Sequence, residues 1–152
     1  AVKQLRRDRG VRANIWTSFP RLIVSIDWLK APRAMALLDA VLPPDSTVYP
    51  RKFDLLVVDE VHQCAPAGRG AYATDSQRTI ALRKIAAHFE HRLFLSATPH
   101  NGYTESFTAL LELLDPQRFA RGVRPSDEAQ RRVLVRRLKS ELRKELPPRD
   151  DG

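Results

Sequence analysis

The chain has 152 residues, enough for one folded domain with a hydrophobic core of its own. Its 26 lysine and arginine residues outnumber 18 aspartate and glutamate residues, and the resulting net charge of +8 favours a polyanionic partner such as nucleic acid, with a functionally silent basic surface as the alternative. A hydrophobic content of 43% excludes a disordered polypeptide, and the single cysteine, Cys64, excludes an internal disulfide.

Residues 1–20 are interpreted as a lead-in segment. The stretch from Lys3 to Arg12 is charged, and Gly10 within it is typical of a helix end. No uninterrupted apolar stretch with a cleavage site follows the basic residues, which argues against a secretory signal. Because the chain begins at Ala1 without an initiator methionine, we expect a fragment of a larger cytoplasmic protein.

Three apolar runs predict the strands of a parallel sheet. They comprise residues 21–26, 53–58 and 92–95. Because these runs do not alternate with polar residues, they indicate strands that helices cover on both faces. The apolar run 22–29 is interrupted by Asp27 and is far shorter than the roughly 20 residues of a membrane-spanning helix, so we expect no membrane association.

Helices are predicted between and after these strands. The expected ranges are 28–42, 76–89, 105–114 and 127–146. In the second helix Ile80, Ile85 and Phe89 are expected to face inward, and in the last helix Val135 begins an apolar face opposite a row of arginines. The alternation of strands and helices predicts an α/β fold.

Polar side chains follow each predicted strand. They are Ser25 and Asp27 at the first strand, Asp59, Glu60 and His62 at the second, and Ser96, Thr98 and His100 at the third. In an open parallel sheet, ligands bind at the carboxyl ends of the strands. We therefore expect these side chains to converge on one edge of the sheet.

The acidic pair Asp59-Glu60 suits metal-assisted phosphoryl transfer. A carboxylate can hold Mg²⁺ through water, while a neighbouring carboxylate orients or deprotonates the attacking water. The prediction is Asp59 as the magnesium holder and Glu60 as the base. For an isolated Asp-Glu pair, a helix N-cap is an equally good interpretation.

Several strings of the sequence resemble those of superfamily-two helicases. Val57 to His62 resembles motif II, and Leu95 to Pro99 resembles motif III. The segment Thr98 to Gly102, followed by 105–116, resembles the Swi/Snf-type branch. Within that branch, its residues are most similar to those of the bacterial HepA/RapA-like ATPases and of the helicase of DISARM-type phage defence. The segment 135–148 resembles the part that leaves the first lobe in that branch.

This resemblance implies an incomplete, three-layer RecA-like (P-loop NTPase-type) parallel sheet with flanking helices over residues 21–122. Residues 123–152 would form a basic helix and linker towards a second RecA-like lobe. The implied activity is a DNA-dependent ATPase that uses ATP and Mg²⁺ to translocate on double-stranded DNA, with partners in phage defence or transcription.

The resemblance also implies roles for individual residues. His62 would link the hydrolysis site to Ser96 and Thr98, whose hydroxyls can exchange hydrogen-bond partners. Ser25 occupies the position that contacts the nucleic-acid backbone, with a plain strand-end hydroxyl as the alternative.

Two arginines of the last predicted helix are further candidates. Arg136 and Arg137 would contact DNA, or would belong to the solvated face of an amphipathic helix. Trp16 and Trp28 are expected to pack in the core, with base stacking as the alternative.

The sequence contains no Gly-x-x-x-x-Gly-Lys phosphate loop. Without it the chain alone is not expected to hydrolyse ATP, and in a RecA-like sheet the missing neighbouring strand would leave an apolar edge at 93–95. A non-catalytic DNA- or protein-binding module derived from a truncated helicase lobe is the alternative function, and a metal-dependent nuclease is a third.

Two other features of the sequence are assigned no function. The spacing of His88, His91 and His100 with Cys64 matches no common zinc frame. The glycine-rich insert 67–70 after motif II has no assigned function.

Overall fold

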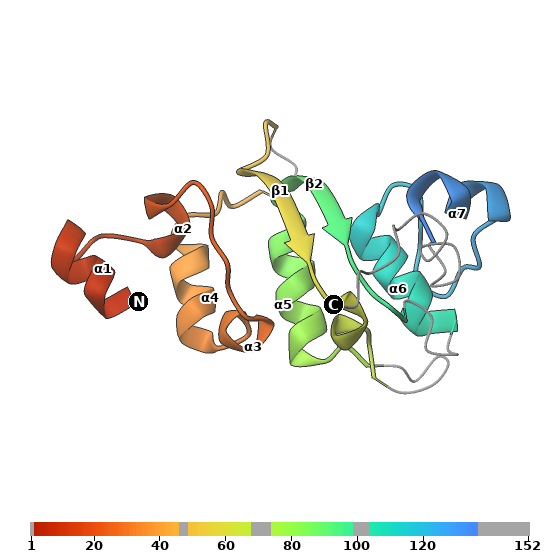
Figure 1. Cartoon of the computed structure of the whole chain (residues 1–152), viewed down its shortest axis with the longest axis horizontal. Coiled ribbons are helices and arrows are strands. Elements are labelled where there is room, and N and C mark those ends of the chain that lie inside the picture. The colour runs from red at the N-terminus through yellow and green to blue at the C-terminus, as the bar shows by residue number, and fades with distance from the viewer. Residues whose placement is uncertain (1, 46–48, 68–73, 99–103, 137–152) are drawn as a thin grey trace, which may run out of the picture.

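The computed structural model describes residues 2–45, 49–67, 74–98 and 104–136. In chain order its elements are α1 (Val2–Arg9), α2 (Ile15–Ser18), α3 (Ile26–Leu29), α4 (Pro32–Asp39), β1 (Phe53–Val58), the 3-10 helix η1 (Val61–Cys64), α5 (Gln77–Ala86), β2 (Phe89–Phe94), α6 (Thr104–Leu114) and α7 (Asp127–Val133) (Figure 1). Among the described residues, no helix has the length and apolar character needed to cross a membrane.

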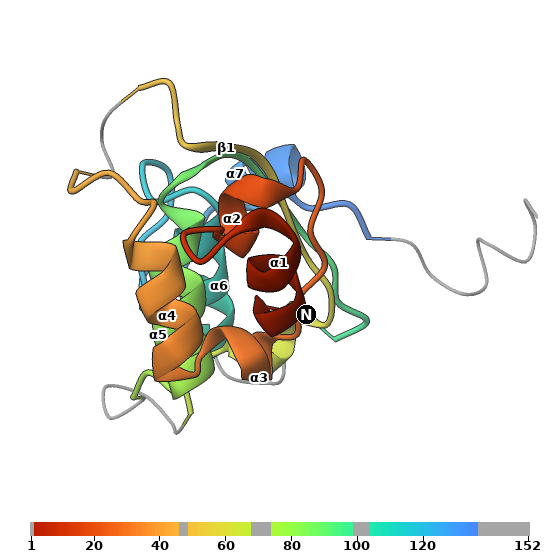
Figure 2. The same ribbon diagram turned by 90° about the vertical axis from the view of Figure 1, so that its left-hand side faces the viewer.

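The centre of the fold is a β–α–β unit. Strands β1 and β2 pair in parallel, from Phe53 opposite Phe89 to Val58 opposite Phe94, and α5 connects them. Helices α5 and α6 lie on the same side of the two strands (Figures 1 and 2). The main core contains Leu82 and Ile85 of α5 and Leu110 of α6, and the covered face of the sheet packs against it. The described part of the chain is therefore a mixed α/β structure, as predicted.

The opposite face of the sheet is not covered by the described residues. Leu55, Val57, Leu93 and Leu95 are between 43% and 55% exposed, and the strand register places Leu93 opposite Val57. The exposure expected at 93–95 is thus present, but it extends across a whole face. The prediction of strands covered on both faces is wrong for the described residues, which form two layers and not three.

The first predicted strand is also wrong. Residues 21–24 have no strand partner among the described residues, and Ser25 is the N-cap of α3. Its Oγ accepts a hydrogen bond from the backbone N–H of Trp28 at 3.1 Å, an interaction that serine favours at a helix start. The predicted helix 28–42 is split into α3 and α4, because Pro32 begins α4 and keeps Ala31 extended.

The later helices are close to their predicted positions but shorter. Helix α5 begins after Ser76 in a capping box with Thr79 and ends at Ala86, so Phe89 belongs to β2 and not to a helix. Ile85 is buried, but Ile80 is 48% exposed, contrary to the prediction.

Helix α7 ends at Val133, because Leu134 is extended. Val135 is exposed and not on an apolar helix face, and the rest of the predicted helix 127–146, from residue 137, lies outside the described residues. At the other end of the chain, α1 ends before Gly10, which has a positive φ of 93°, so the predicted helix end is confirmed.

Candidate active site

The acidic pair lies at a tight turn directly after β1. Two backbone hydrogen bonds continue the sheet pairing past the strand: Leu95 N–H donates to the Val58 carbonyl at 2.9 Å, and Val61 N–H donates to the Leu95 carbonyl at 3.0 Å. Between them Glu60 adopts a left-handed conformation with φ 48° and ψ 43°. A residue with a side chain adopts this conformation at a cost, so the surrounding contacts must hold the turn in place.

The two carboxylates have different surroundings. The Asp59 Oδ1 accepts a hydrogen bond from the Glu60 N–H at 2.9 Å, and both side chains are exposed. Glu60 precedes η1, but its side chain makes no capping hydrogen bond. The local geometry therefore does not match the simple side-chain N-cap that was the alternative interpretation of the pair.

His62 joins the acidic turn to the segment after β2. Its Nδ1 lies 3.0 Å from the Ser96 Oγ and 3.1 Å from the Glu60 Oε2. The backbone N–H of Thr98 also donates to the Ser96 Oγ, at 3.1 Å. The structure thus brings Glu60, His62 and Ser96 together at the carboxyl end of the two strands. Their roles in hydrolysis and coupling stay predictions.

Asp59 is the residue of this site that could bind Mg²⁺. Within the described ranges, no group of three His, Cys, Asp or Glu side chains could enclose a metal ion. Asp59 nevertheless offers exposed carboxylate oxygens. Mg²⁺ keeps several waters and is commonly held by one or two carboxylates together with substrate phosphates, so Asp59 fits a water-mediated site and does not fit an all-protein cage.

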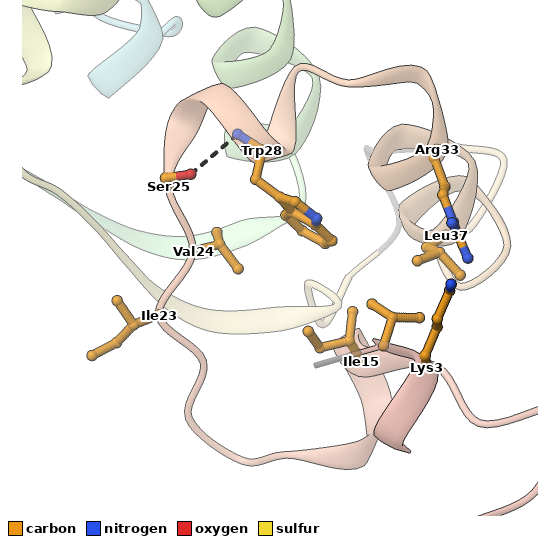
Figure 3. A pocket seen from close by; sticks show the side chains of 9 residues that line it. Lys3, Ile15, Ile23, Val24, Ser25, Trp28, Arg33 and Leu37 are labelled. Carbon is orange, nitrogen blue, oxygen red and sulfur yellow. Dashed lines mark hydrogen bonds between the residues drawn. The ribbon is translucent and has the colours of Figure 1, made fainter. Parts of the chain in front are cut away.

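Ser25 lies away from a strand end, on the rim of an open apolar pocket (Figure 3). The residues that line this pocket are Val2, Lys3, Ile15, Ile23, Val24, Ser25, Trp28, Arg33 and Leu37. The Ser25 hydroxyl accepts from Trp28 N–H and can still donate its own hydrogen. Its contact with a nucleic-acid backbone stays a prediction, now from a helix start.

Asp27, which was expected at the same sheet edge as Ser25, forms ion pairs with two basic side chains. It pairs with Lys30 at 2.8 Å and with Arg78 of α5 at 2.9 Å, and hydrogen bonds from Lys30 and then Arg78 lower the pKa of its carboxyl group. Arg78 also donates to the Gln63 Oε1 of η1, at 3.3 Å. Sequence reasoning missed Arg78 and Gln63. Gln63 directly follows His62, but no local signal marks Arg78, 51 positions from Asp27.

The remaining candidates are placed as follows. Arg136 is exposed just after α7, whereas Arg137, His100 and most of the glycine-rich insert lie outside the described residues. Cys64 is buried in the core, and this burial raises the pKa of its thiol, as expected for a packing residue. Trp16 packs against Trp28 and Phe53, with ring centroids 6.2 and 6.3 Å away, as predicted for core packing.

Comparison with known proteins adds sequence relationships over part of the chain. No protein-family model matches the chain. Fourteen curated proteins match it, and among them is the RNA polymerase-associated protein RapA of Sodalis glossinidius (strain morsitans), which is 37% identical over 84 residues. The similarity supports the helicase-like superfamily and nothing finer. The matched region covers 55% of this chain but only 8% of RapA.

Proposed function

We propose that this chain is part of an ATP-dependent motor that translocates on double-stranded DNA, and that it supplies the acidic half of the ATPase site. The observation that carries the proposal is the contact of His62 Nδ1 with both Glu60 Oε2 and Ser96 Oγ. It connects the acidic turn to the next strand end at the sheet edge where α/β proteins bind their ligands. The similarity to RapA supports the same superfamily.

In this proposal each residue of the site has a distinct task. Glu60 orients or deprotonates the attacking water, and Asp59 would hold Mg²⁺ through water. When bound, Mg²⁺ neutralises the charge that develops on the phosphates. The His62 imidazole fixes the Glu60 carboxylate and passes a change at this turn to Ser96.

The proposal assigns the rest of the site to other parts of the protein. The sequence has no phosphate loop, so the backbone cradle and the lysine for the nucleotide phosphates come from another segment in this proposal. The uncovered sheet face at Leu55, Val57 and Leu93 offers an apolar surface against which such a segment could pack. The RecA-like architecture, the second lobe and the DNA partner all belong to this proposal.

The test is ATP hydrolysis by the intact protein that contains this chain, with and without duplex DNA. Glu60→Gln keeps the size of the side chain but removes the base, so turnover should fall by about 10²–10⁴-fold. The matched control is Glu90→Gln, at an exposed glutamate of β2, which should leave turnover unchanged.

Each of the other outcomes favours a different function. Near-normal turnover in Glu60→Gln would remove Glu60 from the role of base. DNA binding with no ATP hydrolysis in the wild-type protein would favour the non-catalytic binding module. Cleavage of DNA by this chain with Mg²⁺ and no ATP would favour the nuclease.

A further inference from the structure

One guanidinium connects the start of α3 to the helix that follows the acidic turn. Arg78 donates to Asp27 through Nε at 3.0 Å and through Nη2 at 2.9 and 3.0 Å. Its remaining nitrogen, Nη1, donates to the Gln63 Oε1 of η1. All three nitrogens of the guanidinium are therefore used, on two elements that are far apart in the sequence.

The chemistry of this link requires arginine. The planar guanidinium can bind a carboxylate with two nitrogens while the third contacts another group, and a lysine ammonium has no such fixed fork. The Asp27 side chain is 55% exposed and that of Arg78 32% exposed. Ion pairs at this exposure contribute little to stability. The role better supported for a bridge with three donors is to fix the position of α3 relative to η1.

We propose that Arg78 is a positioning residue that couples nucleic-acid contact at α3 to the acidic turn. The inference rests on the proposed function and on the prediction that Ser25 contacts a nucleic-acid phosphate. Asp27 lies two residues after Ser25, and Gln63 directly follows His62. A phosphate at Ser25 repels the nearby Asp27 carboxylate, and Arg78 hydrogen-bonds both Asp27 and Gln63.

The direction of the coupling follows from these contacts. When Arg78 binds Asp27 and Gln63, it holds α3 against η1, and η1 carries His62, which contacts the Glu60 carboxylate. A shift of α3 that draws Arg78 away from Gln63 releases η1. DNA at α3 thereby changes the position of the residues that act on the attacking water.

Cys64 provides a built-in reporter of this coupling. It lies next to Gln63 on η1, is only 2% exposed, and is the single cysteine of the chain. Because the thiol must be uncovered before it can react, its rate of alkylation reports the local opening of η1. Iodoacetamide can therefore measure the state of η1 in this chain without any ATP hydrolysis.

The experiment measures Cys64 alkylation with and without a short DNA duplex at low salt. We expect DNA to raise the wild-type rate about fivefold or more, the lower end of coupling between two sites. In Arg78→Met the change should disappear while DNA affinity is retained, and Arg78→Lys should retain only part of it. Arg83→Met is the matched control, because Arg83 of the same helix binds Asp75 and Glu112 and not α3, so its response should remain.

Three outcomes would overturn the inference. The first is an equal DNA response in Arg78→Met, which would mean that the response does not pass through Arg78. The second is no response in the wild-type chain. The third is loss of DNA binding in Arg78→Met, which would make Arg78 a DNA contact. If Arg78→Met does not fold, Asp27→Asn breaks the same link from the other side and is expected to remove the response.

The same variants separate this inference from the proposed function. In the intact protein, Arg78→Met should lower the ratio of DNA-stimulated to basal ATP hydrolysis about fivefold or more. Glu60→Gln should slow hydrolysis by about 10²–10⁴-fold but keep the Cys64 response. A protein that never hydrolyses ATP would disprove the proposed function, and the alkylation rates would still decide the coupling.

Discussion

His62 and Ser96 are joined across the two strands of the sheet, with 3.0 Å between Nδ1 and Oγ, although they lie 34 positions apart in the chain. The Ser96 hydroxyl also accepts the backbone N–H of Thr98. One hydroxyl therefore holds together the acidic turn after β1 and the segment after β2. A change in the hydrogen bonding of Ser96 therefore alters the contacts of both segments.

The first prediction concerns this hydroxyl. Ser96→Ala removes the partner of His62 and of the Thr98 N–H, so the free energy of unfolding should fall by about 0.5–1.5 kcal/mol, the usual net value of a hydrogen bond. Urea unfolding measures this loss, and the nitrogen chemical shifts of the His62 imidazole should change. Thr98→Val is the control, because it keeps the N–H that donates to Ser96. An unchanged His62 spectrum in Ser96→Ala would show that the contact is absent in solution.

The second prediction concerns the left-handed turn at Glu60. Glu60→Gly and Glu60→Ala both remove the carboxylate, but only glycine also removes the strain of φ 48°. Because a left-handed residue with a Cβ costs roughly 1–2 kcal/mol, partly offset by the extra freedom of glycine in the unfolded chain, the glycine variant should be more stable by about 1 kcal/mol. Urea unfolding of both variants provides the comparison.

A strand position provides the control for that comparison. At Glu90 in β2 the backbone is extended, so glycine should be the less stable of the two replacements. The order of Gly and Ala should therefore reverse between the two positions. The same order at both would mean that the turn at Glu60 is not strained. If Glu60→Gly is more stable than wild type although it lacks the proposed base, the strained backbone at this position is kept for function.

The sequence predicted the parts of this fold that depend on continuous apolar runs. The run 53–58 forms β1 with the same bounds, and 92–95 overlaps β2, because residues buried against α5 and α6 must be apolar whatever their partners are. The convergence of Glu60, His62 and Ser96 followed from the rule that ligand-binding residues gather at the carboxyl ends of parallel strands.

The missed features depend on choices that apolar content does not reveal. The run 21–26 is rich in branched residues, but Ser25 caps a helix and the preceding residues have no pairing strand among the described residues. Uncovered Leu55 and Val57 look the same in sequence as buried strand residues. The Asp27–Arg78–Gln63 link is a tertiary contact between polar residues, for which spacing in the sequence carries no signal.

The third prediction concerns the pH dependence of stability at Glu112 on α6. Burial raises the pKa of this carboxyl group, but the N–H of Arg121 at 2.8 Å and the guanidinium of Arg83 at 2.7 Å outweigh it and place the pKa below its ordinary value. A lowered pKa stabilises the fold above the ordinary glutamate range, and this contribution is lost as the pH falls through the folded-state pKa. Glu112→Gln should therefore be less stable than wild type near neutral pH, by an amount that shrinks on acidification.

Unfolding by urea at several pH values between about 3 and 7 tests this prediction. Thr108→Val is the control, since it removes the acceptor of the Gly122 N–H beside the same network and contains no titratable group. Its loss of stability should not vary with pH relative to wild type. A Glu112→Gln deficit that is constant across this range would mean that the Glu112 charge does not stabilise the fold.

The fourth prediction concerns the uncovered face of the sheet. Val57 and Leu93 lie opposite each other and are each about half exposed. An apolar sheet face in water favours association with other molecules, and a two-stranded sheet also leaves strand edges open to pairing. Replacing both residues by threonine places β-branched side chains on the strands and removes much of the apolar surface, so the isolated chain should associate with itself less, as measured by sedimentation velocity.

The position of the substitution on the strand decides how this result is interpreted. Leu56→Thr changes the neighbouring residue of β1, whose side chain packs against the core on the covered face. It places a hydroxyl there and should lower the free energy of unfolding by about 1–3 kcal/mol without reducing self-association. The Val57→Thr, Leu93→Thr variant should lose little stability, because no described residue covers that face. Equal losses of stability in the two variants would mean that a further layer already covers the face in solution, and the two-layer arrangement would then be wrong.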